Sequence, residues 1–132
     1  MKTKHFYTFA LIILAFAGMS LMAATTAQDE KVVTVDKMVH DFGTIDKESG
    51  PQSATFVVTN NTDEPVLITS VKASCGCTAS EWTKTPIEPG KTGTVTAKYN
   101  PAGQSGPFTK TVTIYTSSTP ERITVNIKGI VQ

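Results

Sequence analysis

Hydrophobic and polar side chains alternate along most of the chain after its first 27 residues. In the segment 109–116, Val112 and Ile114 share one parity with Phe108, while threonines occupy the other parity. A period of two residues is typical of a strand with one buried face. Threonine supplies 18 of the 105 residues after position 27, as expected of a β-branched residue on a pleated surface. The alternation predicts further strands at 55–59, 94–99 and 123–127, and less regular ones at 32–35 and 66–71.

Turn-forming residues separate these runs at short intervals. Pro89-Gly90 suits the two central positions of a type II turn, because proline presets the first and glycine tolerates positive φ at the second. Asn60-Asn61-Thr62 matches a glycosylation acceptor, but we interpret it as a turn. No segment after residue 27 shows the 3.6-residue apolar repeat of a helix. Further turn signals are Gly50-Pro51, Asn100 to Gly103 and Ser117 to Pro120.

This pattern predicts an all-β fold, an immunoglobulin-like antiparallel β-sandwich of about seven strands. One face of each strand would supply the core. The predicted core residues are Phe42, Phe56, Val58, Ile68, Val95, Tyr99, Phe108, Val112, Ile114, Val125 and Ile127.

The N-terminal segment has a different composition. Two lysines precede an apolar run from Phe6 to Met22, which is the layout of a secretory signal peptide with a cleavage site after Ala27. Retention as an N-terminal anchor is the alternative, because the run reaches the lower limit of membrane-spanning length. We expect residues 1–27 to be a cleaved signal peptide and 28–132 to be one periplasmic or secreted domain, without a membrane span after cleavage.

The composition of residues 28–132 favours a binding or structural role. Ten basic and eleven acidic side chains form no basic face, so nucleic acid is not an expected partner. The sequence contains no nucleophile elbow, phosphate-binding glycine loop or H-E-x-x-H motif, and no enzyme activity is expected. We interpret His40-Asp41 as a strand-end pair that makes local hydrogen bonds. The predicted function is a non-catalytic interaction or structural module that docks another envelope or secreted protein at a sheet edge or an end loop. In the alternative interpretation, Lys110 and the threonines protect such an edge. No oligomeric state is specified.

The only two cysteines, Cys75 and Cys77, flank a glycine in the sequence SCGCT. In an extended strand they would lie on one side, about 6 to 7 Å apart, which suits two ligands of one metal better than a disulfide. If Gly76 turns, the pair can close into a small ring. Three interpretations stay open: a structural pair without chemistry, a disulfide or redox pair, and a copper or zinc site with His40 and Met38 as weak further ligands. The alternative function is therefore a periplasmic metal-binding or redox-linked protein.

Trp82 lies in a polar segment, 80–84. It is either an exposed contact residue or a ring that packs over the end of the sandwich. The large area of the ring favours packing.

Several short motifs occur together in a fixed order: Asp41 to Ile45, Asn60 to Thr62, Pro65 to Ile68, Ser74 to Thr78, Ile87 to Gly90 and Val125 to Gly129. In this order the chain resembles an exported bacterial family, domain of unknown function number fifteen seventy-three, which is common in the Bacteroidetes. The resemblance covers nearly all of 28–132 and implies an immunoglobulin-like fold and export, without any activity. Apart from the cysteines, the chain is also similar to the abnormal-spindle and hydin domains, major sperm protein and pilus chaperones.

Overall fold

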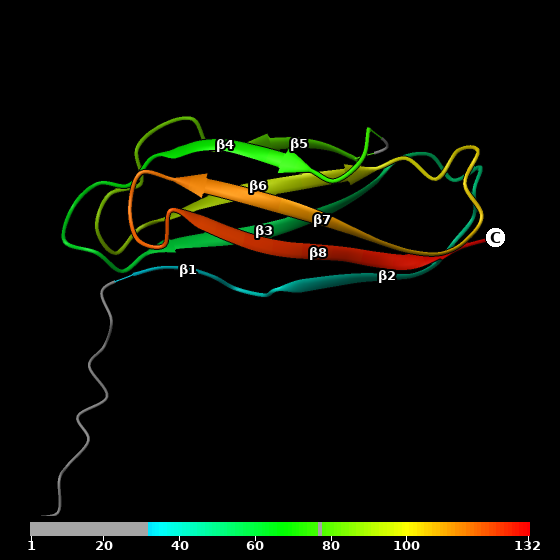
Figure 1. Ribbon diagram of the computed structural model, residues 1–132, viewed down its shortest axis with the longest axis horizontal. Coiled ribbons are helices and arrows are strands. Elements are labelled where there is room, and N and C mark those ends of the chain that lie inside the picture. The colour runs from blue at the N-terminus through cyan, green and yellow to red at the C-terminus, as the bar shows by residue number, and fades with distance from the viewer. Residues whose placement is uncertain (1–31, 77) are drawn as a thin grey trace, which may run out of the picture.

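The computed structural model describes residues 32–76 and 78–132. The predicted signal peptide and Cys77 lie outside the described residues. Eight strands form two four-stranded sheets, and the described residues contain no helix (Figure 1). The strands are β1 (Val33–Val35), β2 (Val39–Ile45), β3 (Gln52–Asn60), β4 (Ile68–Ala73), β5 (Thr78–Trp82), β6 (Thr92–Tyr99), β7 (Gly106–Thr116) and β8 (Arg122–Val131). The predicted immunoglobulin-like β-sandwich is confirmed, with eight strands in place of about seven.

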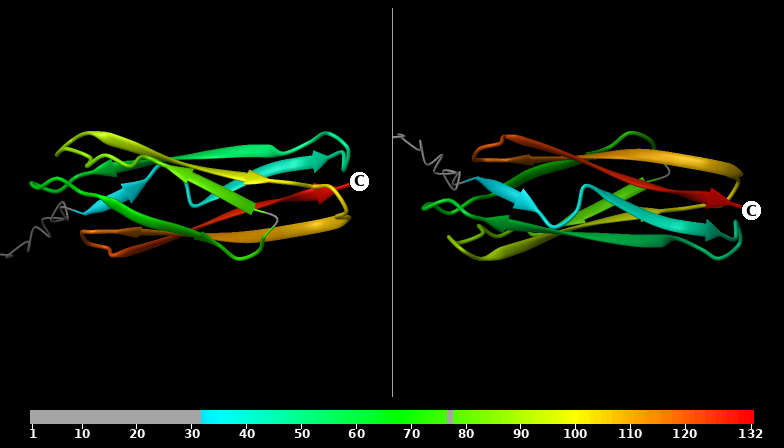
Figure 2. Two further views of the ribbon diagram at one scale, coloured as in Figure 1. Left: turned by 90° about the horizontal axis from the view of Figure 1, so that it is seen from above. Right: turned by 90° about the horizontal axis from the view of Figure 1, so that it is seen from below.

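Sheet A has the strand order β1-β3-β6-β5, and sheet B has the order β2-β8-β7-β4. Strands β1 and β2 therefore lie at one lateral edge of the sandwich, and β4 and β5 lie at the other (Figures 1 and 2). All pairs are antiparallel, as predicted, except that β2 runs parallel to β8. β2 is parallel because the chain leaves sheet A after β1 and continues in the same direction in sheet B, where it pairs with β8.

The predicted alternation places one parity of each central strand in the core. In β3, Ala54, Phe56, Val58 and Asn60 are buried. Nine of the eleven predicted core side chains are buried, whereas Phe42 and Phe108 are only partly buried and pack against the core. These two differ because Phe42 lies on an edge strand, and because Phe108 is paired with a glycine that has no side chain to cover it.

The turn at Pro89-Gly90 has the predicted geometry. Gly90 has φ 75°, and the N–H of Lys91 donates a 2.9 Å hydrogen bond to the carbonyl of Glu88. Both features are those of a type II turn with glycine at its third position. The turn fixes the start of β6 beside the end of β3, where Gly90 N–H donates to the carbonyl of Asn60 at 2.8 Å.

Candidate functional site

His40 and Asp41 make separate contacts near the start of β2. The His40 ring packs edge-on against Phe42, with 4.7 Å between the ring centroids and 65° between the ring planes. Asp41 Oδ1 accepts a 2.8 Å hydrogen bond from the backbone N–H of Gly43, and its Oδ2 lies 3.8 Å from Nζ of Lys128. Successive side chains of a strand point to opposite faces. Asp41 therefore makes the predicted local contact, and the carboxylate does not orient the imidazole as a catalytic acid orients a base.

Burial lowers the pKa of His40 below its ordinary value, because desolvation disfavours the imidazolium. The nearby ammonium of Lys37 lowers this pKa further, while the Asp41 carboxylate opposes both effects. The imidazole consequently stays neutral to a lower pH than a fully solvated histidine does.

The structure divides the weak metal-ligand candidates between the two lateral edges. Met38, 53% exposed, comes immediately before β2, and His40 lies on β2. Cys75 lies in the turn between β4 and β5, at the opposite edge. Across four strands the separation is about 14 Å, far beyond the reach of one metal ion. Within the described parts of the chain, no three His, Cys, Asp or Glu side chains gather as metal ligands.

Cys75 is disulfide-bonded, and its Sγ lies 3.9 Å from Oγ1 of Thr78. Cys77 is outside the described residues, so the pairing of the two cysteines stays a prediction. The preceding residue is held in place, because Ser74 N–H donates to the carbonyl of Thr111 at 2.9 Å and Ser74 Oγ accepts from Thr111 N–H at 3.0 Å. Both bonds attach the start of the turn to β7.

The interpretation of Lys110 as a residue that protects a sheet edge does not hold. Lys110 lies on β7, which pairs with β8 on one side and β4 on the other.

β5 is an edge strand whose outer side is open in the described structure. Thr83 N–H donates to the carbonyl of Thr94 on β6 at 3.0 Å. Because hydrogen-bonding direction alternates along an antiparallel strand, the backbone N–H and C=O of Ser80 and Trp82 point away from β6. The Ser80 hydroxyl is also buried without a hydrogen-bond partner among the described residues.

The other three edge strands carry features that discourage pairing. β1 has only three residues. β2 and β4 each contain a register shift, between Asp41 and Thr44 in one and between Ile68 and Ser70 in the other. Short strands and bulges are the usual protection of sheet edges. β5 pairs with β6 in an unbroken register over all five of its residues, so it lacks this protection.

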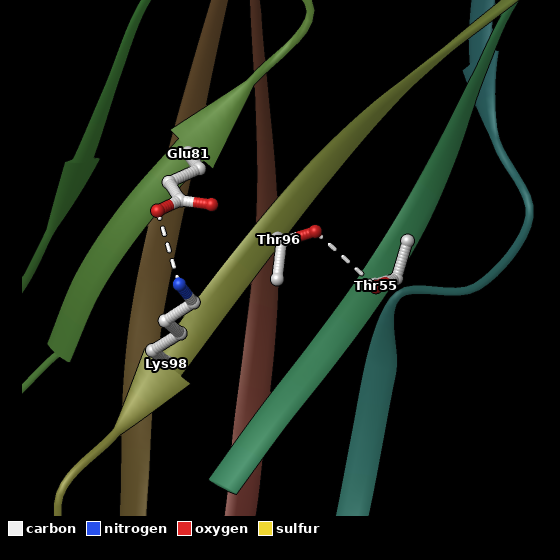
Figure 3. Close-up of polar contacts among 4 residues, drawn as sticks. All are labelled: Thr55, Glu81, Thr96 and Lys98. Carbon is white, nitrogen blue, oxygen red and sulfur yellow. Dashed lines mark hydrogen bonds and ion pairs between the residues drawn. The ribbon is translucent and has the colours of Figure 1, made fainter. Parts of the chain in front are cut away.

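Polar side chains on the outer face of sheet A connect β5 to β6, and β6 to β3 (Figure 3). Lys98 Nζ on β6 donates to Glu81 Oε1 on β5 at 3.0 Å, and the hydroxyl oxygens of Thr96 and Thr55 lie 3.2 Å apart. The ion pair is largely exposed, so it contributes little to stability. It nevertheless neutralises the only charged side chain on β5, beside the open edge.

Trp82 packs against the core, as the area of its ring led us to expect, and it is half-buried. It does so from the edge strand β5 and not from an end of the sandwich. Nζ of Lys84 lies 3.0 Å from the ring centroid, so the ammonium covers the aromatic face.

Comparison with known sequences places this chain in a family. The family described as "Protein of unknown function (DUF1573)" matches residues 33–131, three quarters of the chain. The chain belongs to the DUF1573 family. The predicted resemblance is therefore confirmed, and membership in DUF1573 brings no known activity. No curated protein matches the chain significantly.

Solved structures share the fold of this DUF1573 domain. A protein of unknown function from Porphyromonas gingivalis W83 is 15% identical, with a TM-score of 0.65, over 75% of this chain and 46% of its own. The VesB protease of Vibrio cholerae is 18% identical, with a TM-score of 0.61, over 74% of this chain and 31% of its own. The ASH/PapD-like domain 7 of human CEP192 is 8% identical, with a TM-score of 0.62, over 77% of this chain and 86% of its own.

The chain thus spans less than half of the Porphyromonas and Vibrio proteins, and these identities show a common fold alone. In the part of the chain that the structure describes, no helix is both long and apolar enough to span a membrane.

Proposed function

We propose that this DUF1573 protein is an exported, non-catalytic module that binds an extended segment of another envelope or secreted protein along β5. The open, regular edge of β5 carries this proposal. A fifth strand added to sheet A would pair with the outward backbone groups of Ser80 and Trp82. Side-chain pockets beside the edge would then set the specificity for the segment.

A non-catalytic role is supported by the contacts of the side chains that most often perform catalysis. The His40 ring packs on Phe42, and the Asp41 carboxylate accepts a hydrogen bond from a backbone amide. Asp36 Oδ1 likewise accepts from the N–H of Val57 at 2.8 Å, and Asp46 Oδ1 from that of Glu48 at 2.8 Å. These groups hold turns and strand ends in place.

Two variants of one residue test the β5 edge. Ser80→Pro removes the N–H that points away from β6, and proline is tolerated on an edge strand when its missing N–H faces solvent. Ser80→Ala, the matched control, keeps this N–H and removes only the hydroxyl. In binding assays with envelope extract, we expect wild type and Ser80→Ala to retain the same partner and Ser80→Pro to lose it, with all three proteins folded by circular dichroism. Equal retention by the three would refute docking at this edge.

Export has its own test. N-terminal sequencing of the periplasmic or secreted protein should begin at Gln28. Recovery of the chain with Met1 in the membrane fraction would contradict cleavage after Ala27.

A second candidate function follows from the disulfide-bonded state of Cys75. In this alternative the protein is redox-linked through Cys75 and Cys77; a copper or zinc site is less well supported, because His40 and Met38 lie at the other lateral edge. Intact mass after thiol alkylation, with elemental analysis, tests it. A monomer that takes up two alkyl groups only after reduction supports the pair. A covalent dimer that a reductant splits contradicts it, and stoichiometric metal lost in Cys75→Ser would support the metal site instead.

A further inference from the structure

Tyr115 lies between two basic residues on the outer face of sheet B. It is on β7, directly opposite Arg122 on β8. Lys72 on β4 is opposite Thr113, two residues from Tyr115 on the same face, and its Nζ lies 5.7 Å from the centroid of the Tyr115 ring. Three neighbouring strands therefore place one aromatic ring and two cations side by side.

An open depression of about 520 Å³ adjoins this ring. Its lining residues are Tyr115, Pro120, Glu121 and Arg122, from the end of β7 and the turn into β8. The volume is in the range of small-molecule sites. Pro120 forms a rigid, apolar part of the wall, and Glu121 is its one carboxylate.

The two cations have no partner of opposite charge in the described structure. The ion pairs there join Lys98 to Glu81 and Lys128 to Asp41, and neither involves Lys72 or Arg122. Lys128 differs from these two cations. It lines a depression of about 320 Å³ on the same sheet, but its Nζ lies 3.8 Å from Oδ2 of Asp41 and is therefore already paired. An incoming anion would gain more at Lys72 and Arg122, because neither is ion-paired, although the Glu121 carboxylate in the same depression opposes part of that gain.

We propose that Lys72, Tyr115, Pro120 and Arg122 form a binding site for an anionic sugar ring, a uronic acid or a sugar phosphate. The apolar C–H face of a pyranose stacks on the Tyr115 ring, while its carboxylate or phosphate pairs with the two cations. The guanidinium of Arg122 can bind either anion through two parallel hydrogen bonds. The site lies on sheet B and does not depend on docking at β5, which belongs to sheet A.

Titrations of residues 28–132 followed by amide NMR shifts test the site. The probes are methyl β-glucuronide, glucose 6-phosphate and the uncharged methyl β-glucoside. We expect saturable shifts around Tyr115 and Arg122, with at least one anionic probe binding about tenfold more tightly than the glucoside. The anion that binds better identifies the source of the charge. Affinity should fall as salt rises, because the cations are exposed.

Matched variants separate the site from general charge effects. Lys72→Ala, Arg122→Ala and Tyr115→Ala should each weaken binding about fivefold or more, whereas Lys128→Ala should leave it unchanged. Ser80→Pro should also leave it unchanged, so a failure of β5 docking and a failure of sugar binding are distinguishable. The proposal is overturned if neither anionic probe gives saturable shifts up to about 10 mM, if the glucoside binds equally well, or if Lys128→Ala weakens binding as much as Lys72→Ala does.

Discussion

The side-chain nitrogen Nδ2 of Asn60 lies 2.8 Å from the carbonyl oxygen of Ile87, and Asn60 is fully buried. The same nitrogen donates to the carbonyl of Glu64 at 2.7 Å. Oδ1 accepts from the N–H and hydroxyl of Thr62 at 2.8 and 2.6 Å. One amide therefore joins the end of β3, the turn after it and the segment before β6. The glycosylation-like Asn60-Asn61-Thr62 is a structural turn, as predicted.

Replacing Asn60 should destabilise the domain. Asn60→Ala removes four hydrogen bonds of a fully buried side chain and should lower the free energy of unfolding by about 2 to 4 kcal/mol. Asn60→Asp should cost more at neutral pH, since a buried carboxylate would face two carbonyl oxygens. Its pKa would be raised in the folded state, so the stability of this variant should fall as pH rises from about 4. Urea unfolding at several pH values measures both effects. Asn61→Asp is the matched control, because the Asn61 side chain is exposed; an equal loss there would contradict the role of Asn60.

Phe56 is 0% exposed, at the centre of β3. Phe56→Ala should lower the free energy of unfolding by about 3 to 5 kcal/mol, through lost burial and a residual cavity. Thr55→Ala, on the outer face of the same strand, should cost less than about 1 kcal/mol. Chemical denaturation of both variants checks the difference, and similar losses would mean that the core does not lie where the structure has it.

Gly129 allows β2 and β7 to lie close to β8. A Cβ at this position would be 2.9 Å from the carbonyl oxygen of Gly43 and 2.9 Å from Cε1 of Phe108. Gly129→Ala should therefore lower the melting temperature, with a cost of about 1 to 3 kcal/mol. Gly76→Ala is a suitable comparison, because the Cβ that alanine adds at this position would have no described atom within 4 Å beyond its chain neighbours. An unchanged melting temperature for Gly129→Ala would show that β2 does not approach β8 as closely as described.

His40 is the only histidine of residues 28–132, so its imidazole can be titrated directly by proton NMR. Its pKa should lie below 6.5, rise in Lys37→Gln and fall further in Asp41→Asn. Because the unfolded chain binds the proton first as pH falls below about 6.5, the free energy of unfolding should decrease there until the folded pKa is passed. His40→Gln should lose this dependence. A pKa above 6.5 would contradict the burial of the ring.

The fold was predictable where one parity of a strand is apolar, as in β3, β6, β7 and most of β8. β2 and β5 were not predicted as strands. In β2 the bulge at Gly43 shifts the alternation, so that Phe42 and Ile45 fall on opposite parities. In β5 the inward positions are Thr78, Ser80 and Trp82, of which only one is apolar.

The candidate sites depend on which strands pair and in which register, and the sequence pattern does not specify this. Lys72 and Arg122 are fifty residues apart and meet at Tyr115 only because β4, β7 and β8 are neighbours in this register. The separation of Cys75 from His40 likewise follows from strand order and not from spacing. A feature whose residues all lie in one short segment, such as the turn at Pro89-Gly90, was predictable.

The parallel pairing of β2 with β8 has a mechanical consequence. Strands β2 and β8 run in the same direction. Strand β1, which precedes β2, extends from the start of β2 toward the opposite end of the sandwich from the C-terminus (Figure 1). Tension that pulls Val32 and Gln132 apart along the long axis acts parallel to these strands. It must shear the hydrogen bonds between β2 and β8 together, because they cannot open one at a time from a hairpin end. We therefore expect the domain to resist extension along this axis more strongly than a domain whose terminal strands separate from a hairpin end.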